Sequence, residues 1–64
     1  MIIETTVKSV FDNSNCLETT DGSFVIKKGI LADACMKYLK EGSLVRLYGD
    51  EKGNITTVYF LGGR

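Results

Sequence analysis

Apolar and polar residues alternate along five stretches of the chain, and each stretch is rich in β-branched and aromatic side chains. A period of two residues is typical of a strand that buries one face. We therefore predict strands at residues 2–11, 16–20, 23–28, 43–48 and 55–61. Asp21-Gly22 is a strong signal for a two-residue hairpin turn. The polar runs at 12–15 and 49–54 predict a turn and a second hairpin loop.

The same alternation predicts which side chains enter the core. The predicted inward positions are Ile3, Val7, Phe11, Phe24, Ile26, Val45 and Leu47. The last stretch is different, because both of its faces are apolar. Ile55, Tyr59 and Leu61 are predicted on one face, and Val58 and Phe60 on the other.

The period changes after Gly29 and predicts one short helix at residues 30–41. Its apolar stripe has three- and four-residue spacing and consists of Leu31, Ala34, Cys35, Tyr38 and Leu39. Gly42 is predicted to end the helix. The helix is expected to close one end of the sheet with Leu31, Cys35 and Leu39.

The elements follow the order β-β-β-α-β-β, and 64 residues leave room for a single domain, residues 1–64. Five strands in so short a chain do not leave long sheet edges open, because closing the sheet removes them. We predict a mainly β fold, a small five-stranded barrel with one short helix.

The element order resembles that of the OB fold, the oligonucleotide/oligosaccharide-binding barrel. The residues that carry the resemblance are 39–49, Leu-Lys-Glu-Gly-Ser-Leu-Val-Arg-Leu-Tyr-Gly, followed by Gly53-Asn54-Ile55. They look like the passage from helix end through glycine, strand, glycine and hairpin to the last strand. The first strand lacks a glycine at its middle, where many OB barrels bend. An SH3-like barrel and an open sheet completed by a dimer are therefore alternatives.

The composition argues against catalysis, a metal and a cofactor. The chain has no histidine, the commonest general base at neutral pH, and no nucleophile elbow, phosphate loop or dinucleotide fingerprint. Asp50 and Glu51 lie in a predicted hairpin tip, and Cys35 lies on the apolar stripe of the helix. Cys16 and Cys35 lack the spacing of a zinc site, and we expect both thiols to be reduced. We predict a non-catalytic binding module.

The resemblance to OB barrels implies single-stranded nucleic acid as the first candidate ligand. Such barrels stack bases on aromatic side chains within a positive groove. The candidate binding residues are Lys27, Arg46, Tyr48 and Tyr59, with Lys8 and Lys28 adding to a basic surface. The chain as a whole has no basic excess, because eight Lys and Arg balance eight Asp and Glu. The resemblance extends to barrels that bind proteins and small molecules.

The apolar residues beyond those that a small core can bury point to association. Ile2, Val58 and Phe60 are the candidate interface residues, for a homo-oligomer or for a protein partner. A small protein-interaction or inhibitor module is therefore the alternative function, and a small-ligand binder with its pocket at a subunit interface is a third.

No stretch is long and apolar enough for a membrane span. The first residues lack the basic start and apolar run of a signal peptide. We expect a cytoplasmic protein with no membrane partner.

Overall fold

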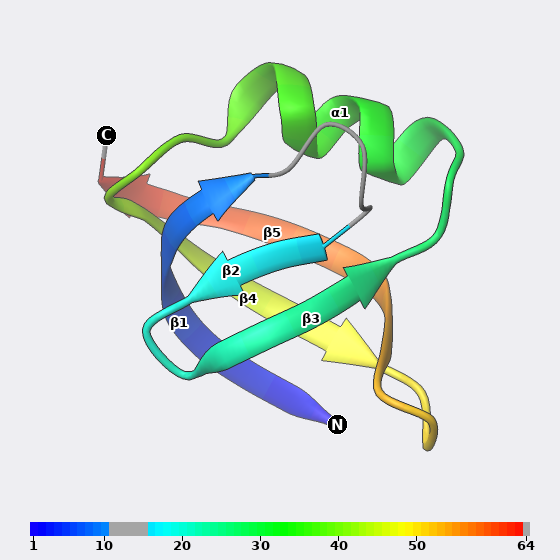
Figure 1. Cartoon of the computed structure of the whole chain (residues 1–64). Coiled ribbons are helices and arrows are strands. Elements are labelled where there is room, and N and C mark those ends of the chain that lie inside the picture. The colour runs from blue at the N-terminus through cyan, green and yellow to red at the C-terminus, as the bar shows by residue number, and fades with distance from the viewer. Residues whose placement is uncertain (11–15, 64) are drawn as a thin grey trace.

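The computed structural model describes residues 1–10 and 16–63 (Figure 1). They form strands β1 Ile2–Val10, β2 Cys16–Thr19, β3 Gly22–Ile26, β4 Ser43–Gly49 and β5 Asn54–Gly63, and helix α1 Ile30–Tyr38. The strands close into a barrel in the order β1-β2-β3-β5-β4, with β4 pairing back onto β1. The predicted mainly β fold and its element order are confirmed. The alternative of an open sheet is wrong.

β1 bends without a glycine. Its register against β2 shifts between Val7 and Ser9, so that Lys8 is an extra residue on this strand. Such a bulge bends a strand and increases its twist, and β1 changes partner here, from β4 to β2. The bulge also changes the phase of the alternation, because Val7 is buried before it and Val10 packs against the core after it. The predicted inward position of Phe11 lies outside the described residues.

β5 carries two further register shifts against β4. Thr56 is the extra residue at the first shift and Leu61 at the second. Ile55 therefore faces the core, whereas Tyr59 pairs with Arg46 on the outside of the barrel. The prediction that Ile55 and Tyr59 share a face is wrong, because each bulge reverses the two-residue period.

The core lies inside the barrel and beneath α1, which crosses one end of it (Figure 1). Its buried apolar residues are Val7, Leu17, Ile26, Ala32, Cys35, Leu39, Val45, Leu47 and Ile55. The predicted inward positions Ile26, Val45 and Leu47 are confirmed, and Phe24 packs against this core.

The helix buries a slightly different stripe from the predicted one. Ala32 and Cys35 are its buried residues, and Leu39 is buried at its C-cap. Tyr38, predicted on the stripe, is 69% exposed. The nine-residue helix therefore meets the core mainly through Ala32 and Cys35, and Leu31 of the predicted stripe packs beside them.

Two glycines have roles that differ from those predicted for them. The first hairpin pairs Thr19 with Gly22, which starts β3, so its turn residues are Thr20 and Asp21. Gly22 has φ of 118°, a conformation that suits glycine. The helix ends at Tyr38, before Gly42. Gly42, with φ of 93°, lies instead in the turn that leads into β4, and its N–H donates to the carbonyl of Val7.

In the part of the chain that the structure describes, no helix combines the length and the hydropathy that crossing a membrane requires.

Candidate interaction face on strands β1, β4 and β5

Three neighbouring strands present a continuous outer surface. In β4 the side chains of Val45 and Leu47 enter the core, so those of Leu44, Arg46 and Tyr48 point outward, as predicted. The pairing of β4 with β1 and β5 adds their outward residues on either side. We call this surface the outer face; it consists of Ile2, Glu4, Thr6, Leu44, Arg46, Tyr48, Thr57, Tyr59 and Leu61.

An ion pair occupies the middle of the outer face. Glu4 of β1 lies opposite Arg46 of β4 in the register of the two strands. The Nη2 and Nε atoms of Arg46 donate to Oε2 of Glu4 at 2.8 and 2.9 Å. Hydrogen bonding to Glu4 is the largest cause that raises the pKa of Arg46 above its usual range, and a hydrogen bond with Tyr48 is the second. The central charges of the face therefore balance each other.

Two tyrosines lie beside this ion pair. The rings of Tyr48 and Tyr59 meet edge to face, with centroids 5.5 Å apart and an interplanar angle of 75°. Tyr59 is 53% exposed and pairs directly with Arg46 across the β4–β5 ladder. The two rings thus form an aromatic surface next to the guanidinium group.

The border of the outer face is apolar. Ile2 is 67% exposed, and Leu44 and Leu61 are each 45% exposed. An antiparallel sheet with one solvated face usually carries polar residues there. Leu44 and Leu61 also line one shallow hollow with Glu4 and Thr6. The face therefore joins exposed apolar and aromatic side chains around a balanced ion pair.

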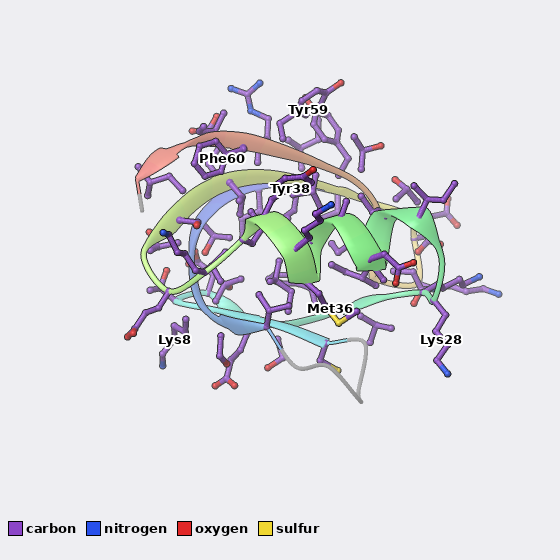
Figure 2. The ribbon with its side chains drawn as sticks, turned by 90° about the horizontal axis from the view of Figure 1, so that it is seen from above. Lys8, Lys28, Met36, Tyr38, Tyr59 and Phe60 are labelled. Atoms are coloured by element: carbon purple, nitrogen blue, oxygen red, sulfur yellow. The ribbon has the colours of Figure 1, made fainter. Side chains whose placement is uncertain are left out.

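The structure brings together three of the six predicted nucleic-acid-binding residues: Arg46, Tyr48 and Tyr59. The other three are lysines that lie elsewhere. Lys27 follows β3 and lines a hollow with Asp50 and Glu51. Lys8 is at the β1 bulge and Lys28 in the turn before α1, at opposite sides of the molecule and both apart from Tyr59 (Figure 2).

The predicted interface residues do not form one surface either. Ile2 lies on the outer face, Val58 is partly buried against the core, and Phe60 points to the other side of β5. Phe60 is 56% exposed and lines a hollow of about 230 Å³ between β5 and α1, together with Tyr38. Figure 2 shows this pair of aromatic residues along the helix side of β5.

Sequence reasoning missed Glu4, Leu44 and Leu61 as members of a site. Leu44 carries a signal in the sequence, because it is an apolar residue at a position where the alternation of 43–48 calls for a polar one. Leu61 carries only the general signal that both faces of the stretch 55–61 are apolar, and Glu4 carries none. Their places follow from strand register and from the bulge at Leu61.

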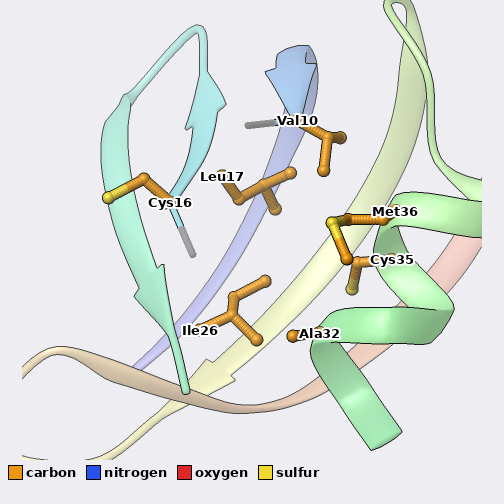
Figure 3. Close-up of a pocket in the computed structure, with 7 residues that line it drawn as sticks. All are labelled: Val10, Cys16, Leu17, Ile26, Ala32, Cys35 and Met36. Carbon is orange, nitrogen blue, oxygen red and sulfur yellow. The ribbon is translucent and has the colours of Figure 1, made fainter. Parts of the chain in front are cut away.

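The two cysteines line one small pocket with Val10, Leu17, Ile26, Ala32 and Met36 (Figure 3). The pocket has a volume of about 10 Å³, roughly the room needed by one water molecule. Both thiols are free, and the sulfur of Cys16 points away from Cys35 (Figure 3). Burial raises the pKa of the Cys35 thiol. This pocket is therefore too small for an organic ligand.

No protein-family model matches the chain, and neither do any of the curated proteins or solved structures compared with it.

Proposed function

We propose that the protein is a non-catalytic binding module built on an OB-type barrel, and that its outer face binds a protein partner. The strand order β1-β2-β3-β5-β4, with the helix between β3 and β4, supports the OB assignment. This barrel type serves many ligands. The residues of the outer face therefore decide which class of ligand we propose.

The observation that carries the proposal is the composition of the outer face. The cores of protein interfaces are rich in tyrosine, arginine and apolar residues and poor in unpaired charge. The outer face has Tyr48, Tyr59 and Arg46 at its centre, with the charge of Arg46 balanced by Glu4. Exposed leucines and Ile2 surround them. Contiguous exposed apolar residues of this kind mark interaction sites on soluble proteins.

The test uses a pair of matched substitutions. Leu44 and Val25 are 45% and 46% exposed, each on the outer side of a strand, but only Leu44 belongs to the outer face. Proteins retained by the immobilised wild-type chain are identified and purified, and their affinity is then measured by calorimetry. We expect Leu44→Asp to weaken binding by about tenfold or more and Val25→Asp to change it little. Equal effects of both substitutions, or binding that neither one changes, would contradict the assignment of the face.

A second candidate function, single-stranded nucleic-acid binding, rests on a specific observation: Arg46, Tyr48 and Tyr59 converge on one exposed surface. Base stacking on such rings contributes about 1–3 kcal/mol per base. The scattered lysines and the engaged Arg46 favour the protein ligand. Fluorescence anisotropy with a mixed-sequence oligonucleotide separates the two functions. Nucleic-acid binding would be supported if the affinity falls steeply with salt and is lost in Arg46→Glu but not in Lys52→Glu. If the wild-type chain leaves the anisotropy of the oligonucleotide unchanged, this second function is excluded.

A further inference from the structure

We infer that the partner of the outer face is a second copy of this chain, packed face to face across a two-fold axis. This inference rests on the proposed function, because it names the partner for the same surface. The occupant is identified by charge complementarity, by the fit of the apolar positions and by the size of the face.

Charge complementarity comes from the central ion pair. One positive and one negative group lie side by side on adjacent antiparallel strands, Arg46 on β4 and Glu4 on β1. A two-fold axis that runs along the strands between β1 and β4 exchanges these two positions. It places each Arg46 over the partner subunit's Glu4, so four charges of alternating sign meet. A face with only one sign of charge would repel its own copy.

The same axis brings an exposed apolar side chain and a tyrosine together. Ile2 lies opposite Tyr48 in the β1–β4 register, so the axis places each Tyr48 over the partner subunit's Ile2. Leu44 lies opposite Thr6, and it meets the partner subunit's Thr6. The side chains that would be covered include the most exposed apolar residue of β1, Ile2 at 67%. Isologous contacts of this kind use one patch twice, and they are the commonest route to a closed dimer.

The size of the face sets the expected strength. A standard interface buries about 800 Å² on each partner, which is roughly a fifth of the 4281 Å² that this chain exposes. The axis overlays β1 and β4 of the two copies, so the contact is about two strands wide, and neighbouring strands are about 4.8 Å apart. A dimer through this contact lies at the small end of specific interfaces, so we expect reversible association that depends on concentration.

Charge reversal on the two central residues tests the inference. Sedimentation velocity is measured from about 5 µM to about 500 µM, because association follows mass action. We expect the wild-type chain to sediment as a dimer at the upper end. Glu4→Arg and Arg46→Glu each place like charges opposite one another, and each is expected to raise the dissociation constant about tenfold or more. Lys52→Glu, in the β4–β5 loop outside the face, is the control and should leave the constant unchanged.

Two recombinations make the test specific to this arrangement. An equimolar mixture of the E4R and R46E chains is expected to form a heterodimer, because every central charge then faces its opposite. The double variant E4R/R46E is expected to regain the homodimer for the same reason. Circular dichroism of each variant checks that the barrel is folded, and both residues are partly exposed, so the substitutions leave the core intact.

The outcomes separate this inference from the proposed function. A wild-type chain that stays monomeric up to about 500 µM would overturn the inference. So would a dimer that withstands both single reversals, or a mixture that fails to associate. If a monomeric chain still retains another protein in a way that depends on Leu44, only the inference fails. If it neither associates nor retains a partner, the proposed function fails as well.

Discussion

The rings of Tyr48 and Tyr59 meet edge to face across the β4–β5 ladder, with their centroids 5.5 Å apart. The two residues are not direct partners, since Tyr48 pairs with Thr57 and Tyr59 with Arg46. Their contact is diagonal, and long aromatic side chains reach such diagonal neighbours. It depends on the bulge at Thr56, because without that extra residue Tyr59 would point inward.

Removing one of these two rings is expected to affect association more than the stability of the fold. We expect Tyr59→Ala to lower the free energy of unfolding by only about 0.5–1.5 kcal/mol, the value of an aromatic pair on a partly exposed surface. The same change should weaken association through the outer face more strongly, because Tyr59 supports the ring of Tyr48, which the two-fold axis places over the partner subunit's Ile2. Urea unfolding and sedimentation of the same variant give the two quantities. A large loss of stability with unchanged association would contradict the role given to this ring.

Gly63 lies against the turn before β4, and a side chain there would collide with backbone. A Cβ atom at Gly63 would stand 2.5 Å from the carbonyl oxygen of Gly42, and the φ of Gly63 is +87°. Gly62 also has positive φ, +144°, but has open space around it. We expect Gly62→Ala to cost about 1–3 kcal/mol from backbone strain alone. Gly63→Ala should cost about 1–3 kcal/mol more, because backbone must shift. Equal midpoints for both variants in urea unfolding would exclude the collision.

The second hairpin depends on an ionised carboxylate. The backbone N–H groups of Asn54 and Lys52 donate to Oδ1 of Asp50 at 3.0 and 2.9 Å, and the bond from Asn54 is the main reason that the pKa of Asp50 is lowered. The carboxylate of Asp50 therefore binds a proton more tightly in the unfolded chain than in the folded chain. The stabilisation is therefore complete above the usual pKa of 3.8 and is lost as the pH falls through the lower folded value.

Thermal unfolding at several pH values tests this hairpin. At about pH 6 the melting temperature of the wild-type chain should be higher than that of Asp50→Asn. The difference between the two melting temperatures should decrease as the pH falls below about 4. Melting curves whose separation is the same at every pH would show that the charge of Asp50 has no part in the hairpin.

The two thiols should react at different rates in the folded protein. Cys35 is 4% exposed and its burial raises its pKa, so little thiolate forms at neutral pH. Cys16 is only partly buried. With a disulfide reagent we expect one fast thiol in the native protein and two in denaturant, and Cys16→Ser should remove the fast one. Equal native rates for both thiols would contradict the burial of Cys35.

The sequence by itself determined the element order and most of the inward positions. Val45 and Leu47 could be placed in the core because the two-residue period of a strand is a property of the backbone and needs no knowledge of neighbours. The same holds for Phe24 and Ile26. The change of period after Gly29 located the helix, and the glycine-rich hairpins separated the strands.

Only the tertiary structure decided which outward residues share a surface. The bulges at Lys8, Thr56 and Leu61 each reverse the alternation of inward and outward side chains. The residue types at these three positions do not predict a bulge. Closure of the barrel requires the strands to bend and stagger, and the bulges provide this bending. The bulge at Thr56 is the reason that Tyr59, and not its sequence neighbour Phe60, joins Arg46 on the outer face.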